Sequence, residues 1–194
     1  MNNTTWDWGL FDALNFDGGN VMDWIMSAIS GIAMWIPLYA IIIYIVWRRW
    51  QWRGVVMLVV AAAIAMGLAD IISGIFKHTG PLKELWSSFP VRQRPMFTEA
   101  LDDVHVVSSA HGPYGTVSAH AATITALAVI SSMVIARRWF SYTMLIIALL
   151  VCYSRIYLAC HFPQDILLGV ATGLLTGYIG ARLFRYGMKR WQRV

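Results

Sequence analysis

The sequence predicts an all-α fold: a polytopic transmembrane bundle of five spanning helices, with an N-terminal interfacial helix and a partly helical outer loop. Three observations favour this fold class. Of the 194 residues, 58% are hydrophobic. Only 13% are charged, whereas ordinary soluble domains carry roughly 25%. Several apolar runs also reach the roughly 20 residues that an α-helix needs to cross a bilayer.

The first twenty residues are aromatic and acidic rather than continuously apolar. Trp6, Leu10, Ala13 and Leu14 recur at helical spacing, which is typical of a short helix lying on the membrane. The segment lacks the basic region of a cleavable signal peptide. We therefore expect residues 1–22 to form an N-terminal interfacial segment.

The rest of the chain, 23–194, is expected to form a single membrane-embedded domain. Its five spanning helices are predicted at about 23–47, 54–76, 116–136, 140–160 and 163–187. Pro37 should kink the first of them. The loop that connects the second and third helices is too long for a simple connection, so we expect it to be functional or partly helical.

Glycines at 169, 173 and 177 form a small-xxx-small stripe on the last helix. Such a stripe lets two helices approach closely, either within one chain or between two copies. Packing within the chain is the more frequent use, and a homo-oligomer stays open.

The basic residues predict how the bundle is oriented. Clusters of Arg and Lys follow the first and third helices and the last helix, at 48–53, 137–138 and 182–193, and none of the ten acidic residues lies there. Cytoplasmic loops carry such an excess of Lys and Arg, and Trp residues beside them fit an aromatic belt. The long outer loop and the connection before the last helix should therefore face the exterior, or the periplasm of a bacterial inner membrane.

A polar break between the last two apolar runs holds Arg155, His161 and Asp165. Ionisable residues at this depth are costly and usually mark a functional site. Arginine binds phosphate or carboxylate bidentately, histidine can act as a nucleophile, and a carboxylate can hold the imidazole in one tautomer. The stretch predicts a reaction centre for a phosphorylated substrate.

Two further clusters should lie at the same end of the bundle. Lys77 and Arg94 come from the outer loop, while Ser118, Ala119 and His120 lead directly into the third helix. A phosphoryl group in transfer spreads negative charge over its oxygens and needs several fixed donors.

Each residue of these clusters has an expected role. His161 is the candidate nucleophile, Asp165 orients it, and His120 is the candidate general acid. The expected phosphate-binding groups are Lys77, Arg94, Arg155, the Ser118 hydroxyl and the backbone N–H groups that begin at Ala119.

The pattern resembles the type 2 phosphatidic acid phosphatase family. Ser154, Arg155, His161 and Asp165 match S-R-x5-H-x3-D without a gap, Val117-Ser118-Ala119-His120 is similar to P-S-G-H, and Arg94-Pro95 resembles the end of K-x6-R-P. The resemblance implies an all-helical fold shared with vanadium-dependent haloperoxidases. It also implies lipid substrates and hydrolysis of a phosphomonoester or diphosphate without a metal or other cofactor.

The sequence departs from the family pattern at two places. Val117 and Ala119 replace the Pro and Gly of the second motif, and strict spacing of the first motif would place its lysine at Ser87. We take Lys77 as the equivalent after an insertion, with Lys83 as the competitor.

The function that these residues favour is an integral-membrane lipid phosphatase acting at the periplasmic face through a phospho-histidine. Its partners would be a phosphorylated lipid and the bilayer, with no nucleic acid. Undecaprenyl diphosphate, the phosphate of lipid A, and phosphatidylglycerophosphate or phosphatidate are the candidate substrates. The alternatives are a non-enzymatic transporter or lipid-binding protein, an intramembrane serine hydrolase using Ser118 and His120, and a vanadate-dependent peroxidase.

Three readings of single residues also stay open. Arg92 could be a second phosphate contact or a solvated loop charge. Asp70 could pair with Lys77 or Arg155. The histidines at 105, 111 and 120 could hold zinc with nearby aspartates, although their spacing matches no compact motif.

Overall fold

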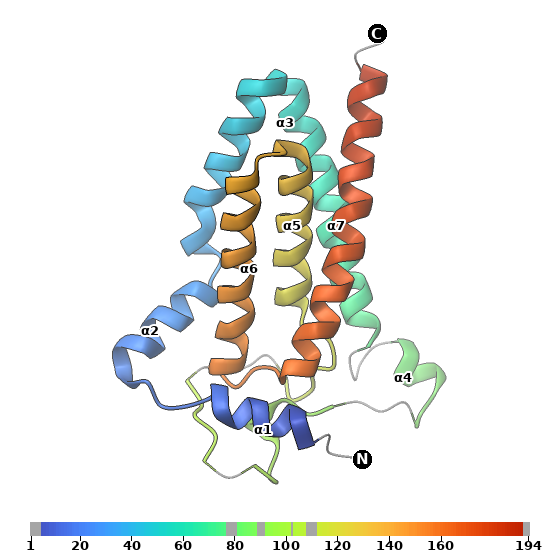
Figure 1. Cartoon of the computed structure of the whole chain (residues 1–194). Helices are drawn as coiled ribbons and strands as arrows, with labels where there is room; N and C mark the ends of the chain where they lie inside the picture. The colour runs from blue at the N-terminus through green and yellow to red at the C-terminus, as the bar shows by residue number, and fades with distance from the viewer. Residues whose placement is uncertain (1–4, 77–80, 89–91, 102, 108–111, 192–194) are drawn as a thin grey trace.

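The computed structural model describes residues 5–76, 81–88, 92–101, 103–107 and 112–191. The elements are α1 (Thr5–Leu14), α2 (Gly19–Ser30), the 3-10 helix η1 (Ala33–Trp35), α3 (Ile36–Ile75), α4 (Pro81–Leu85), the 3-10 helix η2 (Pro95–Phe97), α5 (Ala119–Ile135), α6 (Arg138–Tyr157) and α7 (Pro163–Trp191). Figure 1 shows them as a helical bundle with smaller helices at one end. The predicted all-α fold class is confirmed.

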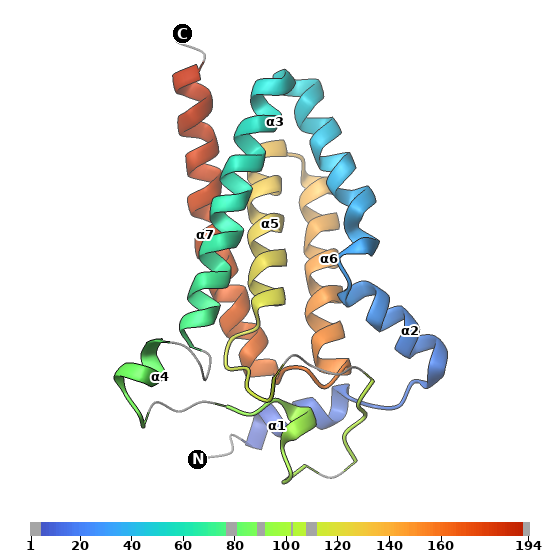
Figure 2. The same cartoon turned by 180° about the vertical axis from the view of Figure 1, so that it is seen from behind.

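Helix α3 is a hairpin rather than one straight helix. Gln51 has φ 55° and ψ −161°, which interrupts the helical geometry, and the chain reverses at the top of the bundle in Figures 1 and 2. Its two limbs, 36–50 and 52–75, lie with α5, α6 and α7 along the bundle. In the described part of the chain, three helices are long and apolar enough to cross a membrane, and α5 is a shorter apolar helix.

The prediction of one continuous helix over 23–47 is wrong. Helix α2 ends at Ser30, and Gly31 is extended with φ −82° and ψ 146°. Pro37 lies in the first turn of α3, where a missing N–H breaks no hydrogen bond. Pro37 therefore begins a helix instead of kinking one, and α2 leaves the bundle obliquely (Figure 1).

Helix α5 is the central element, packed against α3, α6 and α7. The glycine stripe of α7 faces α5. A Cβ on Gly169, Gly173 or Gly177 would lie 2.5, 2.4 or 2.7 Å from the carbonyl oxygen of Ser118, Ala122 or Ala126. The stripe therefore serves packing within the chain, which is the more frequent use of such stripes.

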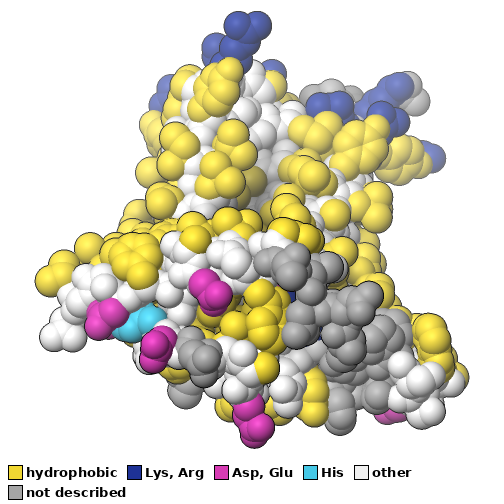
Figure 3. Space-filling view, turned by 60° about the horizontal axis from the view of Figure 1, so that its bottom comes forward, with side chains coloured by type: hydrophobic (Ala, Val, Ile, Leu, Met, Phe, Trp, Pro, Cys, Tyr) yellow, Lys and Arg dark blue, Asp and Glu magenta, His cyan; other side chains and the backbone are white. Residues whose placement is uncertain are grey.

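The two ends of the bundle differ in charge. Figure 3 shows acidic side chains gathered at the end that carries α1, and Lys and Arg side chains gathered at the opposite end. There Arg49 donates to the Ile135 carbonyl at 3.1 Å and Arg53 to the Trp191 carbonyl at 3.4 Å. Cations thus bind the last carbonyls of α5 and α7, where the helix dipole favours positive charge.

Helix α1 lies across the acidic end, beneath α6 and α7 (Figure 1). It buries the face that carries Asp7 and Phe11, and Asn15 directly after the helix is also buried, while Trp6 and Leu10 are exposed. Phe11 packs on Phe162 with ring centroids 5.3 Å apart. The predicted helix is present, and its buried face closes this end of the bundle.

Candidate active site

The turn between α6 and α7 carries His161 into the interior. Ala159 adopts a left-handed conformation with φ 53°, and the Arg155 carbonyl accepts from the backbone N–H groups of Cys160 and His161 at 3.0 and 3.2 Å. His161 is 3% exposed and Asp165 is 1% exposed. A tight turn therefore places an imidazole and a carboxylate together in the protein interior.

The two ring nitrogens of His161 have different partners. Nε2 lies 3.1 Å from Arg94 Nη1, and Nδ1 lies 3.4 Å from Asp165 Oδ2. A guanidinium has no acceptor atom, so Nε2 must accept and the proton of the neutral ring belongs on Nδ1, facing Asp165. Asp165 Oδ2 also accepts the Phe162 N–H at 3.1 Å. This arrangement leaves the lone pair on Nε2, the nitrogen nearest the arginine.

Two paired loop segments hold Arg94. Its backbone N–H donates to the Pro113 carbonyl at 2.8 Å, and its side chain donates to the carbonyls of Gly112 and Cys160 at 3.1 and 3.0 Å. A Cβ on Gly115 would lie 3.0 Å from His161 Cε1 and 3.2 Å from Arg94 Cζ. Glycine at 115 thus lets the loop backbone approach both groups.

The start of α5 joins the same site. Ser118 is fully buried and caps α5, its hydroxyl accepting from the Ala121 N–H at 3.4 Å. Its own N–H donates to the Asp165 carbonyl at 3.1 Å. Ala119 is the first residue of α5 and His120 follows it. The helix N-terminus, with its positive dipole, is therefore tied directly to the first turn of α7.

Arg155 approaches from the last turn of α6. Its guanidinium hydrogen-bonds the Ser30 hydroxyl through Nη1, and its buried Nε has no hydrogen-bond partner within the described residues. Burial lowers the pKa of Arg94, and the positive charge of Arg155 lowers it further. The two guanidinium groups therefore repel each other, and an anion bound near both would reduce this repulsion.

The same cations act on the nucleophile candidate. Burial lowers the pKa of His161 well below 6.5, and the charges of Arg94, Arg155 and His120 lower it further. His161 is therefore neutral at physiological pH, the form in which a ring nitrogen can attack. Arg94 and Asp165 thus contact the two ring nitrogens of His161, and Arg155 and His120 lie near enough to act on its charge.

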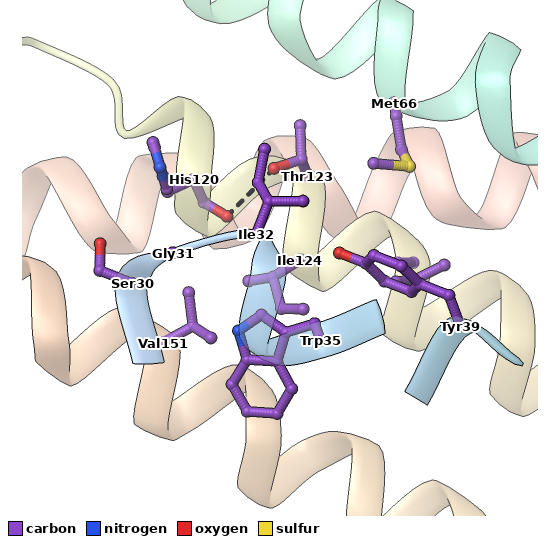
Figure 4. Close-up of a pocket in the computed structure, with 11 residues that line it drawn as sticks. Ser30, Gly31, Ile32, Trp35, Tyr39, Met66, His120, Thr123, Ile124 and Val151 are labelled. Atoms are coloured by element: carbon purple, nitrogen blue, oxygen red, sulfur yellow. Dashed lines mark hydrogen bonds between the residues drawn. The ribbon is translucent and has the colours of Figure 1, made fainter. Parts of the chain in front are cut away.

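A small cavity borders this site among the helices of the bundle. It has a volume of about 60 Å³ and lies among residues 30–35, α3, α5 and α6. Figure 4 shows apolar side chains such as Ile32, Trp35 and Ile124 around it, with His120 and Ser30 at one end. Because Ser30 binds Arg155, this cavity begins beside the cationic site.

Some of the predicted residues lie outside the described part of the chain, and others have partners that were not predicted. Lys77 falls outside the described residues, as does the side chain of Lys83. Arg92 pairs with Asp7 and its side chain is 19% exposed, so it is not a solvated loop charge. Its role as a second phosphate contact stays a prediction. Asp70 is exposed, and Arg155 bonds to Ser30 rather than to Asp70.

Among the described residues, the expected zinc ligands His105 and His120 do not fall in one group of ligand atoms. His105 hydrogen-bonds Asp23 at 2.8 Å. Asp17 lies near this pair, while the position of His111 lies outside the described residues.

Sequence reasoning missed Asp7 and Asn15. Asp7 is fully buried and accepts the Gln164 N–H at 2.9 Å, and Asn15 donates to the Tyr157 carbonyl at 2.8 Å. The available signal was their spacing, since Asp7, Phe11 and Asn15 repeat every four residues and so share one helix face.

Comparisons with known proteins agree with this geometry. The family model described as the PAP2 superfamily matches residues 58–189. A lipid A 4'-phosphatase of Bacteroides thetaiotaomicron is 32% identical over 160 residues, 81% of this chain and 67% of the relative. A lipid A 4'-phosphatase of Porphyromonas gingivalis is 25% identical over 182 residues, 94% of this chain and 74% of the relative.

The crystal structure of Aquifex aeolicus LpxE shares the fold. The match has a TM-score of 0.65 at 19% identity and covers 94% of this chain and 98% of the other. The helical bundle, the three motif segments meeting at one end and the family match over more than half of the sequence all agree. The chain therefore belongs to the PAP2 superfamily and is a lipid phosphatase, which is a phosphoric-ester hydrolase.

Proposed function

We propose that this protein removes a phosphate from a lipid of the lipid A type at the acidic end of the bundle, through a phospho-histidine at His161. One observation carries the proposal: His161 is a buried neutral imidazole with a carboxylate on Nδ1 and an arginine on Nε2. The relatives named lipid A 4'-phosphatase support this substrate class over undecaprenyl diphosphate and the glycerophospholipids.

In the first step, the lone pair of His161 Nε2 attacks phosphorus and the bond from phosphorus to the lipid oxygen breaks. Arg94 and Arg155 stabilise the charge on the phosphoryl oxygens. Asp165 stabilises the positive charge that develops on the ring. His120 gives its proton to the leaving lipid oxygen, so the lipid leaves as a neutral alcohol.

In the second step, water hydrolyses the phospho-histidine. His120, now neutral, takes a proton from the water as its oxygen attacks phosphorus. The bond between phosphorus and Nε2 breaks, and inorganic phosphate leaves. The arginines and the α5 N-terminus supply positive charge throughout, so we propose that no metal is required.

The apolar part of the substrate would remain at the membrane side of the site. The cavity beside His120 is lined mainly by apolar side chains (Figure 4), which suits a hydrocarbon segment next to the phosphate. We place the acidic end at the periplasmic side of a bacterial inner membrane, because the Arg-rich end should stay in the cytoplasm.

The test is release of inorganic phosphate in detergent from lipid A 4'-phosphate, undecaprenyl diphosphate and phosphatidate, each with and without EDTA. We expect release from the lipid A substrate to exceed release from the other two and to survive the chelator. Loss of activity with EDTA, restored by a divalent cation, would contradict the metal-free mechanism. No release from any lipid would favour the transporter or lipid-binding alternative.

Two substitutions test which residue attacks. His161→Ala should abolish turnover while the protein stays folded, because no other group can form the phospho-enzyme. Ser118→Ala should only weaken turnover, since it removes a helix cap worth about 1 kcal/mol. The reverse pattern, with labelling of Ser118 by a fluorophosphonate, would support the serine hydrolase instead. The buried, capping hydroxyl of Ser118 makes that outcome the less favoured one.

A further inference from the structure

Asp7 is a carboxylate that the mechanism above does not use. It lies on α1, before the residues 58–189 that match the family, and its side chain is 0% exposed. A buried carboxylate is costly unless it is paired and hydrogen-bonded. The partners of Asp7 therefore indicate what it stabilises.

Both oxygens of Asp7 are occupied by groups beside the active site. Oδ1 accepts the backbone N–H of Gln164 at 2.9 Å, in the first turn of α7. Oδ2 forms an ion pair with Arg92. The Arg92 guanidinium lies over the Phe162 ring at 3.7 Å from its centroid. Asp7 thus contacts Gln164 directly and Phe162 through Arg92.

Arg92 lies between two carboxylates. Its Nη2 bonds Asp7, while its Nη1 is 3.6 Å from Asp165 Oδ1. The other oxygen of Asp165 faces His161 Nδ1 and the Phe162 N–H. As long as Asp7 holds Arg92, one oxygen of Asp165 is free to orient the imidazole.

We propose that Asp7 is a positioning residue for the His161–Asp165 pair, acting through Arg92 and the first turn of α7. This inference rests on the proposed function. Without the charge of Asp7, the guanidinium has Asp165 as its remaining near carboxylate in the described site and draws that side chain away from His161. The imidazole then loses the acceptor that fixes its tautomer.

The rest of α1 keeps Asp7 in place. Trp8 stacks on Phe162 with ring centroids 6.0 Å apart, and Phe11 packs on the same ring. A fixed carboxylate can hold Arg92 in one geometry, which is what orientation of a reacting group requires.

The test compares Asp7→Asn with Asp12→Asn, which makes the same charge change at an exposed position of the same helix. Asparagine at 7 can still accept the Gln164 N–H but cannot pair with Arg92. We expect D7N to lower kcat for the lipid substrate about 10- to 100-fold with KM nearly unchanged. D12N should behave as the wild type. All rates are taken per folded protein, after size-exclusion chromatography and thermal unfolding.

A double-mutant cycle separates positioning from general destabilisation. If Asp7 acts through Arg92, the variant D7N/R92Q should be no slower than R92Q alone. R92Q also provides the test if D7N does not fold, because it removes the same pair from the other side and should lower kcat by a similar factor.

The outcomes separate the two proposals. Wild-type kinetics in D7N or in R92Q, a lower unfolding temperature with unchanged kcat, or losses that add in the double variant would each overturn the role of Asp7. Phosphate release by the wild type in those experiments would leave the proposed function intact. A wild type that releases no phosphate from any lipid would remove the proposed function, and this inference with it.

Discussion

At the scale of single residues, the chemistry depends on how one imidazole is surrounded. His161 is buried, donates toward Asp165 and accepts from Arg94. Burial and nearby positive charge both favour the neutral ring. Arg94, the proposed phosphate donor, thus also keeps the proposed nucleophile unprotonated, and a substitution of Arg94 should alter both effects.

The pKa of free-enzyme His161 should appear in the acid limb of kcat/KM. Because this pKa lies well below 6.5, protonation of His161 should reduce activity only at a pH below 6.5. Arg94→Gln removes one of the charges that lower the pKa, so the acid limb should move to higher pH. It should also lower kcat/KM about 100-fold at neutral pH by removing a phosphate donor.

The measurement is a pH profile of phosphate release for the wild type and R94Q. An acid limb that stays in place or moves to lower pH in R94Q would contradict the placement of this charge beside His161.

At the scale of elements, the site depends on how closely α5 and α7 approach. Ser118 begins α5 and Asp165 lies in the first turn of α7, and a backbone hydrogen bond of 3.1 Å joins them. Gly169 makes this approach feasible, since a Cβ there would lie 2.5 Å from the Ser118 carbonyl oxygen. The contact that packs α5 against α7 therefore also sets the geometry of the site.

Gly169→Ala should force the two helices apart at the site, because the clashing atom is backbone. We expect a lower unfolding temperature and a loss of at least about 10-fold in kcat. Gly67→Ala is the matched control, since nothing lies within 4 Å of a Cβ there. Gly67→Ala should leave the free energy of unfolding unchanged or raise it by up to about 1 kcal/mol. Equal behaviour of the two variants would contradict the packing described here.

The elements also show what the sequence could predict. The apolar runs predicted α5, α6, α7 and both limbs of α3, because a spanning helix must satisfy its backbone internally. The break before Pro37 was not predictable, since the apolar run continues through Gly31. The motif spacing brought His161, Arg155 and Asp165 together, but the contact of Asp7 with Gln164 spans 157 positions and follows no local pattern.

At the scale of the whole molecule, the asymmetry of charge predicts orientation. Arg48 is exposed at the basic end and Asp12 is exposed at the acidic end. The native Cys152 and Cys160 are buried, so they should react slowly with a membrane-impermeant maleimide. A single introduced cysteine can therefore report which side it faces.

Asp12→Cys should be labelled by the impermeant maleimide in cells whose outer membrane alone has been permeabilised. Arg48→Cys should be labelled only after the inner membrane is lysed, because the proposed orientation puts the positive end in the cytoplasm. The unsubstituted chain gives the background. Labelling of Arg48→Cys in intact spheroplasts would contradict the proposed orientation and indicate the opposite one.

The position of α1 beneath the α6–α7 turn has a consequence for biogenesis. Helix α1 is synthesised before α7, so Asp7 can meet its partners only after Gln164 has been made and inserted. Contacts so distant along the chain form late in folding. A nascent chain that has not yet reached Gln164 therefore holds α3, α5 and α6 before its proposed reaction centre is complete.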